Sequence, residues 1–158
     1  METEISRDQK KREIIKALSV FVKAGNRIDK LLALREETLS QAIYKSPSFN
    51  SPGVNSCGLR PDKMAYALGR IESIDKKIFK VAEHYPDLYD YVAGILENNI
   101  TDYKQRIVME WRYINGAQWK EIAKHTGYVE SHCYRLHELA IKTLIKNDIL
   151  KNNEGETN

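Results

Sequence analysis

Residues 118–144 read QWKEIAKHTGYVESHCYRLHELAIKTL, and the spacing of small and apolar residues in this stretch decides the fold. Two amphipathic segments, 118–126 and 130–146, flank a turn that contains Gly127, a residue that adopts a left-handed backbone at little cost. Small and apolar residues share one face of the two segments, at Ile122, Ala123, Cys133, Leu136, Ala140 and Leu144. A helix-turn-helix needs this order, because its second helix must cross the first closely. The sequence therefore predicts helix-turn-helix geometry.

Two further helices are expected just before this pair. Asp102 precedes a segment of helical periodicity that Asn115-Gly116 ends, as glycine commonly does after the last turn of a helix. A shorter amphipathic helix is expected over 87–96, after Pro86, which cannot continue a preceding helix. The three aromatic residues of this region are expected to pack in a small core rather than to stack on bases: Trp111, Tyr113 and Trp119.

The N-terminal half predicts two longer helices. Apolar residues alternate three and four apart at Ile14, Leu18, Phe21, Gly25, Ile28, Leu32 and Leu39, with Arg35 in one inner position. A second series follows at Met64, Ala67, Ile71, Ile74, Ile78, Val81 and Tyr85. Two such apolar series, one after the other, predict two helices that pack along these residues in an antiparallel, coiled-coil-like hairpin. The serines and prolines of 46–62 predict a mobile loop between its helices.

Composition restricts the class of protein. The chain has 158 residues, 42% hydrophobic and 30% charged, with only eight glycines and four prolines, which favours an all-α fold. We expect a helical hairpin over 1–85, a helix-turn-helix domain over 86–147 and a disordered tail over 148–158. No window approaches eighteen consecutive apolar residues, so no membrane span is expected. Two cysteines without a CxxC pair predict reduced thiols in a cytoplasmic protein.

Neither an enzyme nor a metal site is expected. Cys133 and His137 stand four residues apart, which is the spacing of two metal ligands on one helix face, but no second pair accompanies them. The chain contains no phosphate-binding glycine loop, no nucleophile elbow and no zinc-protease motif. We therefore predict no catalytic residue, no metal and no cofactor.

A resemblance to a known family is based on the segments YING at 113–116, WKEIA at 119–123, TGY at 126–128 and YRLH at 134–137. These resemble region four of bacterial sigma factors, and in particular the ArpU-type regulators encoded by phages of Gram-positive hosts. The closest part spans about 102–144. The resemblance implies promoter binding, alongside host RNA polymerase, in the control of phage late genes. One departure is Val129, which stands where the family commonly has a serine or threonine that caps the recognition helix.

The face of 130–146 opposite the apolar stripe contains the candidate DNA-binding residues. It consists of Ser131, Tyr134, Arg135, Glu138 and Lys142. The N-terminal part of a recognition helix enters the major groove, which also selects Glu130 for base contacts. Arginine binds guanine with two hydrogen bonds, and a carboxylate accepts from cytosine. The resemblance assigns recognition of the minus-thirty-five element to Glu130, Ser131 and Arg135. Three further residues are expected at phosphates: Gln118, Lys120 and His132.

The expected partner is double-stranded DNA, and the expected function is sequence-specific transcriptional regulation, as a phage late-gene activator. Residues 99–158 contain nine basic and eight acidic residues, so one copy is expected to bind DNA weakly. A homodimer formed through the hairpin, or contact with RNA polymerase, would compensate. Two alternatives remain open: a DNA-packaging protein of the small-terminase type, and a helical interaction module that does not bind DNA.

Overall fold

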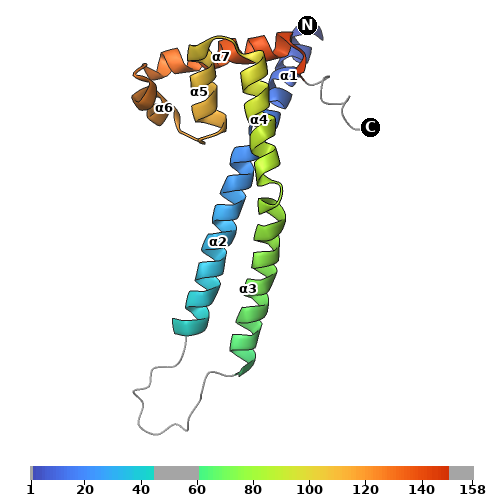
Figure 1. The fold of residues 1–158 in the computed structure, drawn as a ribbon, viewed down its shortest axis with the longest axis vertical. Coiled ribbons are helices and arrows are strands. Elements are labelled where there is room, and N and C mark those ends of the chain that lie inside the picture. The colour runs from blue at the N-terminus through green and yellow to red at the C-terminus, as the bar shows by residue number, and fades with distance from the viewer. Residues whose placement is uncertain (1, 45–60, 150–158) are drawn as a thin grey trace. The chain divides into compact units, whose positions relative to one another are not determined.

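The computed structural model describes residues 2–44 and 61–149, and all regular elements within these ranges are α-helices (Figure 1). The all-α prediction is therefore confirmed for this part of the chain. Most of the loop predicted at 46–62 lies outside the described residues. The helices are α1 (Glu2–Leu18), α2 (Val20–Tyr44), α3 (Pro61–Ala82), α4 (Tyr85–Asn99), α5 (Tyr103–Tyr113), α6 (Trp119–Thr126) and α7 (Glu130–Lys146).

The described chain divides into two compact units whose limits differ from the expected domains. One unit contains the residues up to Ala24 together with those from Tyr85 onward, and the other contains Gly25–His84. The predicted hairpin over 1–85 placed α1 in the same domain as α2 and α3. In the structure α1 instead packs against α7 (Figure 1). The apolar face of α1, which contains Ile14 and Leu18, is covered by α4, α5 and α7, and α1 therefore belongs to their unit.

The core of the first unit shows this packing directly. Ile14 and Leu18 of α1 are 1% and 0% exposed, and Phe21 stacks on Tyr85 with 4.4 Å between ring centroids. Burial of such side chains contributes about 2 kcal/mol each. Their partners in the same cluster come from α4, α5, α7 and the residues that follow these helices: Val92, Ile95, Leu96, Ile100, Met109, Tyr113, Ala140, Ile141, Leu144 and Ile149.

A break at Ser19 separates α1 from α2. The Ser19 hydroxyl donates to the carbonyl oxygen of Ile15 at 2.5 Å, and this kind of back-bonding bends helices. The helical hydrogen bond from Lys23 to the Ser19 carbonyl is retained at 3.0 Å. The apolar spacing runs across this break without interruption, so it gave no sign that two helices are present.

The two ends of the C-terminal half also differ from expectation. α4 begins at Tyr85 and has Pro86 in its first turn, where the missing N–H of proline costs nothing, so the helix is longer than the predicted 87–96. The tail predicted as disordered from residue 148 is ordered at its start. Ile149 is 4% exposed within the core, and Asp148 lies 3.8 Å from the Lys10 ammonium group. The remaining tail, 150–158, lies outside the described residues.

In the second unit α2 and α3 run side by side in opposite directions (Figure 1), and Arg35 of α2 donates to Asp75 of α3 at 2.8 Å. The inner positions predicted for α3 are confirmed, with Ala67 and Ile74 buried. The inner series of α2 is displaced from the prediction, because it passes through Ile28, Leu31, Arg35, Thr38 and Ala42. Leu32 is accordingly 48% exposed, whereas Thr38 is 9% exposed and its hydroxyl donates to a backbone carbonyl in the preceding turn.

Candidate nucleic-acid interface

The turn between α6 and α7 has the backbone geometry that the sequence predicted. Gly127 has φ of 73° and ψ of 11°, in the left-handed region. Gly116, which follows α5, also has a positive φ of 67°. α6 and α7 begin and end within one residue of the predicted limits. The two glycines therefore mark both reversals of the chain between α5 and α7.

The inner faces of α5, α6 and α7 form a small core of their own. Ile122 and Cys133 are fully buried and Leu136 is 5% exposed, as the spacing predicted, and they pack with Val108 and Ala117. The Thr126 hydroxyl, which lies 3.8 Å from the Cys133 sulfur, donates to the carbonyl oxygen of Ile122. This core fixes the orientation of α7, and therefore of its outer face.

A substitution at Gly127 tests the turn. Gly127→Ala is expected to lower the free energy of unfolding by about 1–2 kcal/mol, since a Cβ disfavours positive φ although space is open around it. Gly94→Ala in the interior of α4 is the matched control. It should raise stability by up to about 1 kcal/mol, because alanine favours helix there and the nearest atom to its Cβ is 3.9 Å away. Equal effects of both substitutions in thermal or urea unfolding would contradict the assignment of a strained turn.

The start of α7 lacks a side-chain cap, as the sequence predicted. Val129 occupies the N-cap position, has no capping side-chain hydrogen bond, and is 69% exposed. Its carbonyl accepts from the backbone N–H groups of His132 and Cys133. Glu130 is the acidic residue of the first turn, where a carboxylate is favoured by the helix dipole. The start of α7 is thus stabilised by the Val129 carbonyl and by an acidic residue of its first turn, without a side-chain cap.

The outer face of α7 exposes most of the residues predicted to bind DNA. Ser131, Tyr134, Arg135 and Lys142 are exposed, and Glu130 is half-buried. Arg135 forms no ion pair with any residue that the structure describes. Its guanidinium group is therefore available to an external acceptor.

Aromatic contacts hold part of this face in place. The ring of Tyr134 lies on that of Trp119 in α6, with 4.2 Å between centroids. The guanidinium carbon of Arg112 lies 4.9 Å from the Trp119 centroid, and Arg112 also donates to the Ala117 carbonyl at 2.9 Å. Trp119 also packs against the core of α5, α6 and α7, so it acts in packing, as predicted. Tyr134 is 45% exposed and is held by this ring contact.

The residues predicted to bind phosphates lie at the starts of α6 and α7. Gln118 and Lys120 are exposed, and the Gln118 backbone N–H donates to the Glu121 carboxylate at 2.8 Å. His132 is half-buried and meets the ring of Tyr128 edge to face at 5.0 Å. Among these three residues, Lys120 is the exposed basic one.

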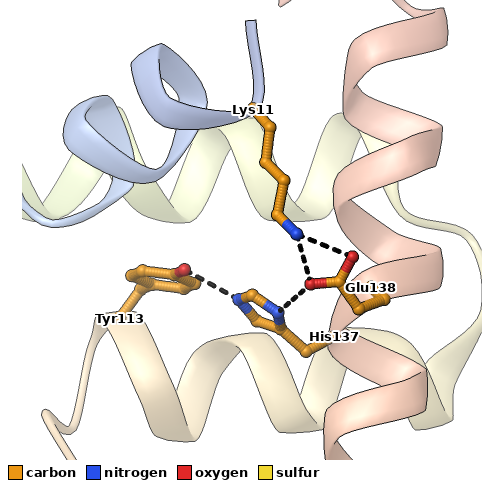
Figure 2. A network of polar contacts seen from close by, with 4 residues as sticks. All are labelled: Lys11, Tyr113, His137 and Glu138. Atoms are coloured by element: carbon orange, nitrogen blue, oxygen red, sulfur yellow. Dashed lines mark hydrogen bonds and ion pairs between the residues drawn. The ribbon is translucent and has the colours of Figure 1, made fainter. Parts of the chain in front are cut away.

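Glu138, also predicted to bind DNA, is half-buried and its carboxylate is already engaged within the chain. Figure 2 shows the Lys11 ammonium group of α1 between the two carboxylate oxygens of Glu138, at 2.7 and 2.9 Å. The hydrogen bond from Lys11 also lowers the pKa of Glu138. Sequence reasoning had no means to find this pair, because the two residues are 127 positions apart. Glu138 therefore joins α1 to α7.

His137 continues this network into the core. It is 7% exposed, shares a hydrogen bond of 2.8 Å with the Tyr113 hydroxyl, and has its Nδ1 atom 3.9 Å from Glu138 (Figure 2). Burial lowers the pKa of His137 to about 4, despite the opposing effect of the Glu138 charge. Burial likewise raises the pKa of Tyr113 to about 12. The imidazole is therefore neutral and structural at neutral pH.

The low pKa of His137 predicts acid sensitivity. An unfolded histidine titrates near 6.5, so stability is complete above that pH and decreases as pH falls toward 4, by at most about 3 kcal/mol. Denaturation between pH 7 and 5 should show this slope, and His137→Gln should reduce it, because glutamine binds no proton in this range. His132→Gln, on the same helix, is the matched control. An unchanged slope in His137→Gln would contradict the assignment.

No protein-family model, no curated protein and no solved structure matches the chain. None of the described helices is both long and apolar enough to span a bilayer. The described residues also contain no group of three or more potential metal ligands. The outer face of α7 is the candidate site, since Ser131, Tyr134, Arg135 and Lys142 are exposed on it.

Proposed function

We propose that this chain is a sequence-specific, double-stranded-DNA-binding regulator of transcription, in which α5, α6 and α7 form a helix-turn-helix and α7 is the recognition helix. The observation that carries the proposal is the two-sided character of α7. Its inner face is sealed by Cys133 and Leu136, whereas its outer face presents Ser131, Tyr134 and Arg135. A helix placed in this way can enter the major groove with its N-terminal residues.

The proposed contacts divide into two kinds. Arg135, with Ser131 and Glu130 nearby, reads base edges, since a guanidinium group binds guanine through two hydrogen bonds. Lys120, Gln118 and His132 bind phosphates, which position the domain without specifying a sequence. Lys142, two turns beyond Arg135 on α7, adds a positive charge on the same exposed face. Glu138 lies on the same helix with its carboxylate paired to Lys11.

Resemblance to sigma-factor region four extends the proposal to the cellular role. Under it, the chain is a cytoplasmic phage late-gene activator that acts at promoters with host RNA polymerase. The near balance of charge in 99–158, nine basic against eight acidic residues, supports a need for a second DNA-bound partner or a second copy of the chain. Dimerisation through α2 and α3 would supply the second copy.

A DNA-binding titration tests this function. Duplexes selected by the full-length protein from fragments of its own genome are titrated at several salt concentrations. A helix that binds phosphates and reads bases gives one preferred sequence and an affinity that falls linearly with salt on a logarithmic scale. Absence of binding even at the lowest salt concentration would reject the proposal. It would favour an interaction module, for which the near-neutral charge is the supporting observation.

A further inference from the structure

The two antiparallel helices of the second unit have two unlike sides. In a right-handed helix the residue after each inner residue lies on one side of the seam, and the residue before it lies on the other. Because α2 and α3 run in opposite directions, the following residues of both helices share one side. The inner residues that define this geometry are Ile28, Leu31, Arg35, Thr38 and Ala42 of α2, and Met64, Ala67, Ile71, Ile74, Ile78 and Val81 of α3.

The side formed by the following residues is mainly apolar, and we call it the apolar face. Its large apolar members are Leu32, Leu39, Ile43, Leu68 and Phe79, of which Phe79 is 71% and Leu68 56% exposed. Its acidic members are Asp29, Glu36, Glu72 and Asp75. The opposite side is basic, with Arg27, Lys30, Arg70, Lys77 and Lys80 among its members. A solvated helical pair would not need this segregation, since large exposed apolar surfaces mark interaction sites.

We infer that the apolar face binds the same face of a second copy of this chain, so that α3 lies antiparallel to its counterpart in a two-fold symmetric dimer. The inference rests on the homodimer of the proposed function, but its test requires no DNA. The contact would bury the exposed leucine and phenylalanine side chains of both copies.

The arrangement of α3 suits self-association. Leu68 and Phe79 flank Glu72 and Asp75 at equal spacing, and these four residues line one shallow hollow together with Ile71 and Lys76. A two-fold axis between the two acidic residues places Leu68 of each copy against Phe79 of the other, which is the reciprocal contact of an isologous interface.

Two of the four acidic residues of this face, Glu72 and Asp75, are paired within one copy. Glu72 accepts from Lys76 at 2.8 Å, and Asp75 accepts from Arg35 at 2.8 Å.

The dimensions of the face are adequate. About twenty residues of helix give the face a length of about 30 Å. Two helices whose axes lie about 10 Å apart give it a width of about 20 Å. The resulting area, on the order of 600 Å², approaches the roughly 800 Å² that each partner of a standard interface buries. A stable but dissociable dimer is therefore expected.

The experiment compares three full-length proteins by light scattering and sedimentation equilibrium over a range of concentrations. Wild type should give twice the chain mass of 18.3 kDa. The double variant Leu68→Glu and Phe79→Glu should raise the dimer dissociation constant by about 100-fold or more, since each lost contact counts twice in a symmetric dimer. Tyr66→Glu is the matched control, because Tyr66 is 68% exposed on the other side of α3, and it should remain dimeric.

Three outcomes would overturn the inference: a monomeric wild type at high concentration, a double variant that remains dimeric, or a Tyr66→Glu variant that dissociates as well. Helix content by circular dichroism, which these exposed substitutions should leave unchanged, separates loss of association from loss of folding. A monomeric wild type that still binds a specific duplex would reject the dimer alone and leave the DNA-binding function standing.

Discussion

Leu18→Ala is expected to lower the free energy of unfolding of the first unit by about 3 kcal/mol, the usual cost of removing a fully buried leucine side chain. Leu18 is 0% exposed at the end of α1, in the cluster that contains Met109 of α5 and Leu144 of α7. The loss would combine the transfer free energy of the deleted atoms with that of a cavity between α1 and the C-terminal helices.

Tryptophan fluorescence makes this measurement specific to one unit, because both tryptophans, Trp111 and Trp119, lie in it. Urea unfolding followed at these side chains should shift to lower denaturant in Leu18→Ala. Leu34→Ala, in α2 of the second unit and 38% exposed, is the control and should leave the tryptophan transition in place. If Leu18→Ala also left it in place, residues 2–24 would not belong to the C-terminal unit.

Arg135→Ala is expected to weaken binding to the preferred DNA sequence by about 10- to 100-fold, the equivalent of about 1–3 kcal/mol for one lost bidentate base contact. Binding to unrelated duplexes should change much less, so the two affinities converge. The reason is that Arg135 is the exposed guanidinium group of α7 and makes no ion pair with the described residues.

Two matched variants sharpen the interpretation. Arg135→Lys keeps the charge but loses the planar fork, so it should retain non-specific affinity without recovering specificity. Arg106→Ala removes an arginine from α5 that lies 3.7 Å from Glu110, and it should leave specificity intact. Equal losses in Arg135→Ala and Arg106→Ala would show that only the total charge matters.

The helices around the candidate site could be predicted from the sequence because their signals are local. Gly116 and Gly127 mark the two turns, and the spacing from Ile122 to Leu144 defines a face that the structure buries. Such patterns depend on backbone preference and helical periodicity, which neighbouring residues determine. The exposed position of Arg135 follows from the same periodicity.

The parts that the sequence could not predict depend on distant residues. Spacing shows that Ile14 and Leu18 share an apolar face, but it does not show which helices cover that face. In α2 the choice between Leu31 and Leu32 is equally open, because adjacent leucines fit either register. The pair Lys11 and Glu138 exists only because α1 packs on α7, which periodicity within α7 cannot show.

Whether α7 contacts DNA is measured most directly by NMR, with the backbone amides of the labelled full-length protein followed during addition of a duplex that contains the selected sequence. DNA bound in the proposed manner shifts the signals of Lys120, Ser131, Tyr134 and Arg135 most strongly, and those of α3 much less. Shifts confined to other helices, with residues 130–135 unchanged, would contradict the assignment of α7 as the recognition helix.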